Sequence, residues 1–544
     1  MVVKSMNRIF LALAIYFCAM PVVFANNLNI TNLNVANIDT ASGTITFTCD
    51  VTQDNSWHNN INFDAVWLFM KYSTDAGQSW SHASMFGYGT NPAGFTAGNN
   101  FALIVPTDEK GFFLQRTDFG SGTITVKGLK FVWNYAQDGV SAAVAQAANT
   151  VHKIFGVEMV YVPQGAFYAG DGNSSSDYRF KAGSSDNNPW YVPSENAITT
   201  TNTSTNGYFY QSSGAINENS SGDIFLVPAS YPKGFASFYL MKYELTEGQW
   251  VSFFNTLSPA AKANRDITSA SLGGKNSDGV VKRNTIAWDA SKSTSNATTL
   301  RPSRPVSFVS WPDVAAYASW SGLRPITELE FEKAARGKDI APVVDEFSWG
   351  SANYTAVGTT DITPDADENG TETLSGSANL NRNNLGFTTG DGRLSAIAQN
   401  QAGSLRAGIF AANSANRINS GAGYYGNMEL SGNLAEPVVT IGRSQGRQFL
   451  ASHGNGQLSI LPGYEGNAVN TDWPGIDNSN ASRGITGTIG IGYRGGDFAS
   501  SNIRTYQLSS RTYASKDPDS LGFYQRYDPG FGVNQGGRLG RSAP

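Results

Sequence analysis

The stretch Leu323-Arg-Pro-Ile-Thr-Glu-Leu-Glu-Phe-Glu-Lys-Ala-Ala-Arg336 says most about the fold of this chain. Thr327 and Glu330 make a capping box, in which each side chain bonds a backbone N–H of the other residue. Phe331 and the alanines after it recur at helical spacing, and Gly337 is the kind of residue that ends a helix. The stretch therefore predicts a short helix with an apolar face packed against a core.

Two further helices are predicted upstream of this stretch. Thr246 and Gln249 form a second capping box, followed by aromatic residues on one face. Another helix is expected to start at Ser310 and to end before Gly322. A strand over 157–162 precedes them, and Gly/Asn-rich loops fill much of the remaining sequence. This pattern indicates an α+β, loop-rich region.

The segment before it, residues 26–154, predicts an all-β sandwich domain. Apolar and polar residues alternate over 29–35 and 43–49, and further apolar runs cover 64–72 and 122–133. Within it, Ser73-Thr-Asp-Ala-Gly-Gln-Ser-Trp80 resembles the Asp-box, a β-hairpin whose Asp bonds the turn backbone. A hairpin needs such turn chemistry whatever the protein does, so we interpret this segment as structural.

Residues 1–25 are typical of an export signal. Lys4 and Arg8 precede the apolar run from Ile9 to Met20, and small residues end at Ala25. Lipidation at Cys18 is disfavoured by the bulky residue before it. The expected location is periplasmic, cell-surface or extracellular. No other apolar run approaches the roughly 18 residues of a spanning helix, so no membrane span is expected.

The composition of the chain limits which partners and which kinds of site are expected. The chain has 544 residues, long enough for two or three domains, and only 15% of them are charged. The formal charge is −5 without a Lys/Arg cluster, which argues against a nucleic-acid partner. The four histidines stand singly, and after cleavage Cys49 is the only cysteine. Neither a histidine-rich metal site nor an internal disulfide is predicted.

Several motifs together resemble one family, the formylglycine-generating enzyme or sulfatase-modifying factor family. They begin with Met159-Val-Tyr-Val-Pro-Gln-Gly165 and Phe238-Tyr-Leu-Met-Lys-Tyr-Glu-Leu-Thr246, and continue with the 323–336 stretch. Phe347-Ser-Trp-Gly350, Ser431-Gly-Asn-Leu-Ala-Glu436, Arg494-Gly-Gly496 and Gly537-Arg-Leu-Gly-Arg541 follow in family order. The resemblance covers residues 155–544 and implies the family's variant of the C-type lectin fold.

The resemblance does not carry the family's catalysis with it. In the enzyme, two cysteines shortly after the Arg-Gly-Gly segment hold copper(I). Here Ser500 and Thr505 stand at those places. A hydroxyl is a hard ligand, whereas copper(I) prefers soft thiolate. We therefore expect no catalytic residues and no copper, and lean towards a protein that is not an enzyme.

Calcium is the cofactor that the resemblance implies, in two structural sites. The first would use Asn353, the Tyr354 carbonyl, Asp367 and the Asn369 carbonyl. The second would use Glu429, the carbonyls of Gly432 and Leu434, and Glu436. Hard oxygen donors suit calcium. The alternative for Glu429 and Glu436 is a pair of solvated loop carboxylates.

The C-terminal segment is the candidate ligand-binding surface. Its residues mix large amphipathic side chains with polar ones, as antibody paratopes do. The same position in this fold is the variable surface of ligand-binding proteins diversified by retroelements, which the segment also resembles. The alternative is a plain polar loop cluster. The candidates are Asn502, Tyr506, Gln507, Tyr513, Tyr524, Arg526, Tyr527, Asp528 and Asn534.

These observations favour a secreted or surface-displayed protein that binds a protein or glycan. Two alternatives remain: a formylglycine-generating-type oxidoreductase that acts by other residues, and a structural part of a bacterial cell-envelope assembly, as in the gliding-motility lipoproteins that resemble this family. A glycosidase-like carboxylate pair is a weaker idea, because three of its five candidates lie in or beside capping boxes. Those candidates are Glu244, Glu247, Glu328, Glu330 and Glu332.

Overall fold

The structure is a computed structural model of the whole chain. It describes residues 27–173, 177–215, 217–292, 294–358, 361–363, 372–374, 376–382, 403–411, 416–515 and 534–544.

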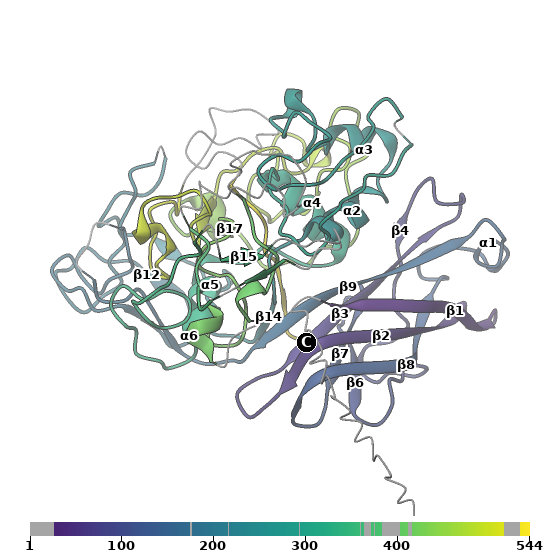
Figure 1. Cartoon of the computed structure of the whole chain (residues 1–544), viewed down its shortest axis with the longest axis horizontal. Helices are drawn as coiled ribbons and strands as arrows, with labels where there is room; N and C mark the ends of the chain where they lie inside the picture. The colour runs from purple at the N-terminus through teal and green to yellow at the C-terminus, as the bar shows by residue number, and fades with distance from the viewer. Residues whose placement is uncertain are drawn as a thin grey trace, which may run out of the picture.

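Strands and short helices are joined by long loops (Figure 1). Among the described residues, no helix is both long and apolar enough to cross a bilayer. The strands are β1 Asn29–Asp39, β2 Thr44–His58, β3 Asp64–Ser73, β4 Ser81–His82, β5 Gly89–Thr90, β6 Phe101–Val105, β7 Phe112–Arg116, β8 Gly120–Asn134, β9 Val151–Val162, β10 Phe167–Ala169, β11 Trp190–Val192, β12 Ile198–Thr199, β13 Leu226–Val227, β14 Phe238–Met241, β15 Ile362–Thr363, β16 Thr373–Leu374, β17 Glu436–Val439, β18 Ile491–Arg494 and β19 Gly540–Ser542. The α-helices are α1 Ala142–Ala145, α2 Glu247–Phe254, α3 Pro259–Asn264, α4 Trp311–Ser321, α5 Glu328–Arg336, α6 Arg417–Ser420 and α7 Ser444–Arg447, with 3₁₀ turns η1 Ala270–Leu272, η2 Ile409–Ala411, η3 Ala481–Arg483 and η4 Ile503–Tyr506.

Two antiparallel sheets pack face to face in the N-terminal part. One has the order β1-β2-β8, and the other contains β3, β7, β6 and β5. Side chains of β2 alternate between buried and half-buried, so Phe47 and Val51 enter the core between the sheets. Leu68 of β3 and Phe131 of β8 meet them there. The four strands predicted from alternation and apolar runs are all present, and β6 and β7 were not predicted.

The second sheet continues into the rest of the chain through β9. Its order is β19-β14-β9-β3-β7-β6-β5. One edge of β9 pairs with β3, where Asp64 lies opposite Val160, and the other pairs with β14, where Phe238 lies opposite Val162. The domain boundary expected at 154/155 falls inside this strand. One of the two N-terminal sheets, β1-β2-β8, is therefore separate, whereas the other is shared with the rest of the chain.

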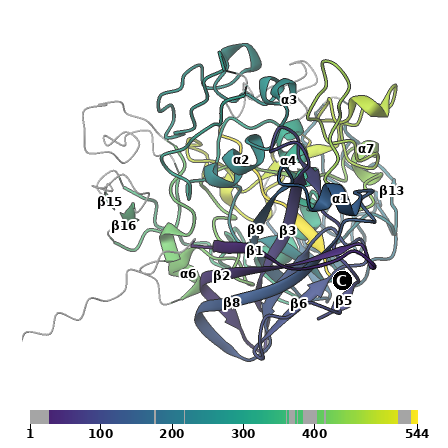
Figure 2. The ribbon, with the colours of Figure 1, turned by 90° about the vertical axis from the view of Figure 1, so that its right-hand side faces the viewer.

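β3 is buried along its whole length because both of its faces are covered. Leu68 faces the β1-β2-β8 sheet, whereas Trp67 and Phe69 belong to the largest core, on the side of α2 and α4. The Trp67 indole donates to the Ser321 carbonyl at 2.8 Å, which ties the sheet to the end of α4. Figure 2 shows β3 and β9 running between the β1-β2-β8 sheet and the helices.

Capping boxes start the three main helices. Those of Thr246 with Gln249 and of Thr327 with Glu330 are present as predicted, and Ser310 pairs with Asp313 in a third. All residues of α5 are buried, so this helix is a central support rather than a surface element.

The predicted hairpin at Ser73–Trp80 is also present, between β3 and β4. The Asp75 carboxylate accepts from the backbone N–H groups of Gln78 at 3.0 Å and Ser79 at 2.9 Å. The Trp80 indole donates to the Gly77 carbonyl at 3.1 Å. Each of these bonds lies within the turn, which agrees with a structural role.

Candidate functional site

Ser500 and Thr505 lie together after β18, and Thr505 belongs to η4. Their side-chain oxygens are 3.2 Å apart. The Asp497 carboxylate holds the turn that leads into Ser500, because it accepts from the backbone N–H groups of Ala499 at 2.8 Å and Ser500 at 3.1 Å. The Thr505 hydroxyl donates to the Asn502 carbonyl at 2.8 Å. The two hydroxyls thus lie side by side, fixed by local hydrogen bonds, with Ser500 half-buried and Thr505 buried.

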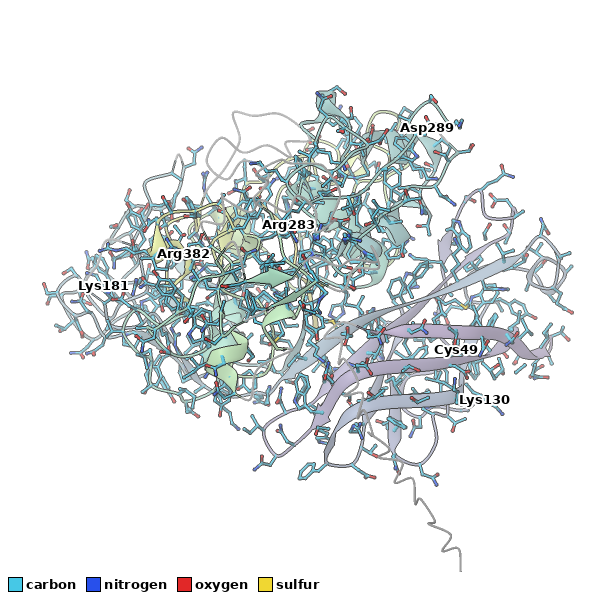
Figure 3. The ribbon with its side chains drawn as sticks, in the orientation of Figure 1. Cys49, Lys130, Lys181, Arg283, Asp289 and Arg382 are labelled. Atoms are coloured by element: carbon cyan, nitrogen blue, oxygen red, sulfur yellow. The ribbon has the colours of Figure 1, made fainter. Side chains whose placement is uncertain are left out.

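The thiol of Cys49 has a different setting. It is buried in β2, between the two N-terminal sheets, and burial raises its pKa to about 12. Figure 3 shows Cys49 among these strands, well away from Arg382, which contacts the segment after Ser500. Such a thiol is protonated at neutral pH and is a poor nucleophile and metal ligand.

The predicted ligand-binding residues fall into three groups. Asn502 is exposed, and Tyr513 and Asn534 are half-buried. Tyr506 and Gln507 are buried. The remaining four lie outside the described residues: Tyr524, Arg526, Tyr527 and Asp528.

The burial of Tyr506 and Gln507 has a structural cause. Tyr506 packs against Phe347 and Trp349, and its hydroxyl donates to the carbonyls of Asp497 and Ser500. The Gln507 side chain accepts from the buried guanidinium of Arg179, more than three hundred residues away in sequence. These two side chains are therefore part of the support of the loop, not of its outer surface.

Three exposed or half-buried residues near the hydroxyl pair were not predicted as ligand-binding. The Arg382 guanidinium lies 5.6 Å from the ring centroids of both Tyr354 and Tyr506, and it donates to the Ser501 carbonyl at 2.7 Å. Tyr354 is 39% exposed, and the Arg504 side chain is 52% exposed. No linear motif marks Arg382, because its partners come from other segments. We call the surface made by Tyr354, Arg382, Ser500, Ser501, Asn502 and Arg504 the Ser500 face.

Each of the four residues in the second predicted calcium set has an oxygen atom that accepts no hydrogen bond within the described residues. Glu429 and Glu436 are buried, and one carboxylate oxygen of each, Oε2, has no hydrogen-bond partner in the described part of the chain. Within the described residues, the carbonyls of Gly432 and Leu434 also accept no hydrogen bond. The other carboxylate oxygens are used: Glu429 Oε1 accepts from the Gly408 N–H at 2.8 Å, and Glu436 Oε1 from Arg538 Nε at 2.7 Å.

Burial makes this arrangement electrostatically unfavourable by itself. It raises the pKa of Glu429 and of Glu436 to about 7. Burial also raises the pKa of the neighbouring Glu244, whose repulsion from Glu436 adds to the effect. A bound divalent cation would stabilise the ionised carboxylates and offset their mutual repulsion, and it would therefore lower their pKa values. The donor chemistry fits calcium, which takes carboxylate and carbonyl oxygens together. In the described part of the chain no three His, Cys, Asp or Glu side chains gather at one metal position, so the carbonyls are essential to this fit.

The first predicted calcium set is only partly within the described residues. Asn353 and Tyr354 are both exposed, and the Asn353 carbonyl accepts from the Trp349 indole at 2.9 Å. Asp367 and Asn369 lie outside the described residues. This set stays a prediction.

The five glutamates weighed as a glycosidase pair are all buried and all have structural partners. Carboxylates already engaged by structural partners are poorly placed to act as a catalytic acid and base, which argues against that idea. Their partners are Arg511 and Arg494 for Glu328, Arg324 for Glu330, Arg336 and Arg494 for Glu332, Thr285 and Thr299 for Glu247, and Asn433 for Glu244.

Comparison with known proteins agrees with the motifs. The model of the sulfatase-modifying factor enzyme 1-like domain matches residues 145–396. This range starts at the end of α1, includes β9 and all three capped helices, and ends before Glu429 and before the Ser500–Thr505 pair.

Two curated relatives match over a short stretch. A formylglycine-generating enzyme of Thermomonospora curvata is 50% identical over 50 residues, and one of Streptomyces coelicolor is 48% identical over 50 residues. Each match covers 9% of this chain and 16% of the relative, so the chain spans about a sixth of the length of either enzyme. Residues 145–396 therefore match a sulfatase-modifying factor enzyme 1-like domain, a domain with a C-type lectin-like fold.

Proposed function

We propose that this protein is an exported, non-catalytic sulfatase-modifying-factor-like protein that binds a protein or glycan ligand through the Ser500 face. The observation that carries the proposal is the hydroxyl pair of Ser500 and Thr505, 3.2 Å apart. The resemblance to the family places two thiols at these positions. The geometry is that of a two-ligand site, but the ligand atoms are oxygen.

The chemistry of the pair supports binding over oxidation. Copper(I) is held by soft thiolates, and a hydroxyl neither ionises at neutral pH nor offers a soft donor. Ser500 and Thr505 instead bond each other and the local backbone. Thr505 is buried and its hydroxyl already donates to the Asn502 carbonyl, so the half-buried Ser500 hydroxyl is the one of the two that suits a polar ligand.

The residues around the pair suit recognition. Arg382 is held over Tyr354, and Asn502 and Arg504 are exposed beside it. A stacked guanidinium next to an aromatic ring and an amide offers contact area at a low cost in conformational entropy. We extend the proposal to structural calcium bound by Glu429, Gly432, Leu434 and Glu436. The cation would supply charge that offsets the two buried carboxylates and fix the loop that carries them.

Two other functions remain open as alternatives. The short identity to formylglycine-generating enzymes is consistent with an oxidoreductase acting on a sulfatase or another protein. A structural role in a cell-envelope assembly is the second, and a surface diversified by a retroelement is a variant of the main proposal.

Copper binding tests the chemical part of the proposal. The wild-type protein is expected to take up no stoichiometric copper(I) in an anaerobic titration against a chromogenic chelator. The variant Ser500→Cys/Thr505→Cys is expected to take up one equivalent. A second variant, Ser510→Cys/Thr512→Cys, places thiols at another hydroxyl pair 3.2 Å apart and controls for thiol pairs in general. Stoichiometric copper on the wild type would contradict the proposal.

Ligand capture tests the binding part. Immobilised wild-type protein, Asn502→Ala and Arg504→Ala are compared for capture from envelope extract, with Tyr88→Ala as control. Tyr88 is 67% exposed and lies in the N-terminal part, so its loss should change nothing. Capture that depends on Asn502 and Arg504 supports the Ser500 face, and equal capture by all variants counts against it.

A further inference from the structure

A concave site lies between the N-terminal strands and the loop-rich part, apart from the Ser500 face. It is a pocket of about 780 Å³ where three segments meet: the end of β2 with the turn after it, the residues after β14, and the segment 416–428 that contains α6, together with Ala411. Figures 1 and 2 show α6 beside these strand ends. The volume is in the range of sites for small ligands. None of the residues of the Ser500 face contributes to it.

Aromatic side chains form much of the wall. Trp57 and Tyr424 are half-buried and accessible, whereas Tyr243 and Tyr425 are buried behind them. Gly426 packs against the Trp57 indole so closely that a Cβ would lie 2.8 Å from the ring. Its φ of +98° also favours glycine. Because Gly426 has no side chain, the Trp57 indole can pack directly against the backbone there and form part of the wall.

Hydrogen bonds fix the wall before any ligand arrives. The Trp57 indole donates to the Asn62 side chain at 3.3 Å, and the Asn62 amide donates to the Tyr425 carbonyl at 2.8 Å. The Lys242 ammonium lies 4.8 Å from the Trp57 ring, and it donates to the Asn55 carbonyl at 3.0 Å. Trp57 is thus held by residues of the N-terminal part and of the loop-rich part. Preorganised aromatic walls lower the entropic cost of binding.

The polar part of the lining is made of amides and cations. The side chains of Asn55, Asn59 and Asn416 line the pocket, and an amide can both donate and accept. The two charged lining residues, Lys242 and Arg417, are positive, and no carboxylate lines the pocket in the described part of the chain. Lys242 is paired with the buried Asp64 carboxylate at 3.1 Å, so the charge that disfavours a cationic ligand comes mainly from Arg417. The amides disfavour a purely apolar one, because its binding would strip water from them without replacement.

We propose that this pocket binds a short saccharide, neutral or acidic. The C–H faces of a sugar ring match the aromatic wall, and its hydroxyls match the amides at the rim. The site is independent of the Ser500 face, so either can fail without the other. An aromatic side chain of a peptide is the competing occupant, and the pocket amides make it the poorer match.

A glycan array spanning neutral, N-acetylated and acidic saccharides tests the proposal on the full-length protein. Retained glycans are then titrated by calorimetry against pocket variants. Tyr424→Leu removes the ring and keeps apolar packing. Asn59→Asp keeps the acceptor oxygen that bonds the N–H groups of Ile61 and Asn62, and removes the amide donor. Circular dichroism and thermal melts confirm that each variant is folded.

We expect at least tenfold weaker binding for Tyr424→Leu and severalfold weaker binding for Asn59→Asp. Tyr88→Ala, and Arg504→Ala of the Ser500 face, should bind like the wild type. The proposal is overturned if no glycan is retained, or if binding survives both pocket substitutions. It is also overturned if an aromatic peptide, and no saccharide, binds in a manner that depends on Tyr424.

Discussion

Replacing Glu429 by Gln separates two contributions to the stability of the folded protein: the destabilisation by a buried charge and the stabilisation by a bound cation. Glu429 is 2% exposed, and its Oε2 atom has no hydrogen-bond partner among the residues that the structure describes. The substitution keeps the shape and keeps an oxygen to accept from the Gly408 N–H. It removes the negative charge that calcium would need. The calcium-free variant should therefore be at least as stable as the wild type at pH 8, and calcium should no longer stabilise it.

The magnitude follows from the pKa of this carboxyl. Burial raises it from 4.5 to about 7, which corresponds to about 3 kcal/mol against the ionised form. Calcium at a hundredfold excess over its Kd would contribute about 2.7 kcal/mol to the wild type. In a chain of this size that is a shift of a few degrees in Tm.

Thermal melts at several pH values make the test sharper. Because the folded-state pKa of Glu429 lies above the unfolded value, the calcium-free folded protein binds more protons than the unfolded chain between pH 4.5 and 7. The calcium-free wild type should therefore lose stability as the pH rises through this window. Calcium competes with these protons, so the stabilisation by calcium should be largest at pH 8 and should fade below pH 7.

Asp118→Asn is the matched control, because it removes the charge of an exposed carboxylate. It should respond to calcium as the wild type does. The reasoning is refuted if excess EGTA leaves the wild-type melt at pH 8 unchanged, or if Glu429→Gln keeps the full calcium response.

Three other substitutions test the supports of the domain in urea unfolding. Glu328→Gln removes the buried charge that pairs with Arg511 at 2.8 Å and should cost about 3 kcal/mol, whereas a loss below 1 kcal/mol would show that the pair is not needed. Phe331→Ala in the α5 core should cost about 3–5 kcal/mol, and a smaller loss would mean that the core closes over the cavity. Thr327→Ala should cost about 1 kcal/mol through the lost cap, while Thr327→Ser should not, and equal losses would exclude the cap as the cause.

Local chemistry made the helices and one hairpin predictable. The capping box of Thr327 and Glu330 involves residues three apart, and the Asp75 turn bonds its own next residues. Such signals are complete within one segment of sequence. The same holds for the closeness of Ser500 and Thr505, which one short turn brings together.

Long-range contacts decided what could not be predicted. β9 joins strands from both predicted domains, and nothing within 151–162 reveals that both of its edges are paired. Gln507 is buried because Arg179 reaches it from another part of the chain. In the pocket wall, Asn62 connects Trp57 to Tyr425, which is also more than three hundred residues away in sequence. Polar and aromatic composition alone does not separate a binding surface from its internal support.

The central claim is that a hydroxyl pair has taken the place of a thiol pair. The most direct measurement is mass spectrometry of a sulfatase-type Cys peptide incubated with the wild-type protein, copper(I) and oxygen. The account predicts an unchanged peptide Cys. Conversion of that Cys to formylglycine, dependent on the folded protein, would contradict it.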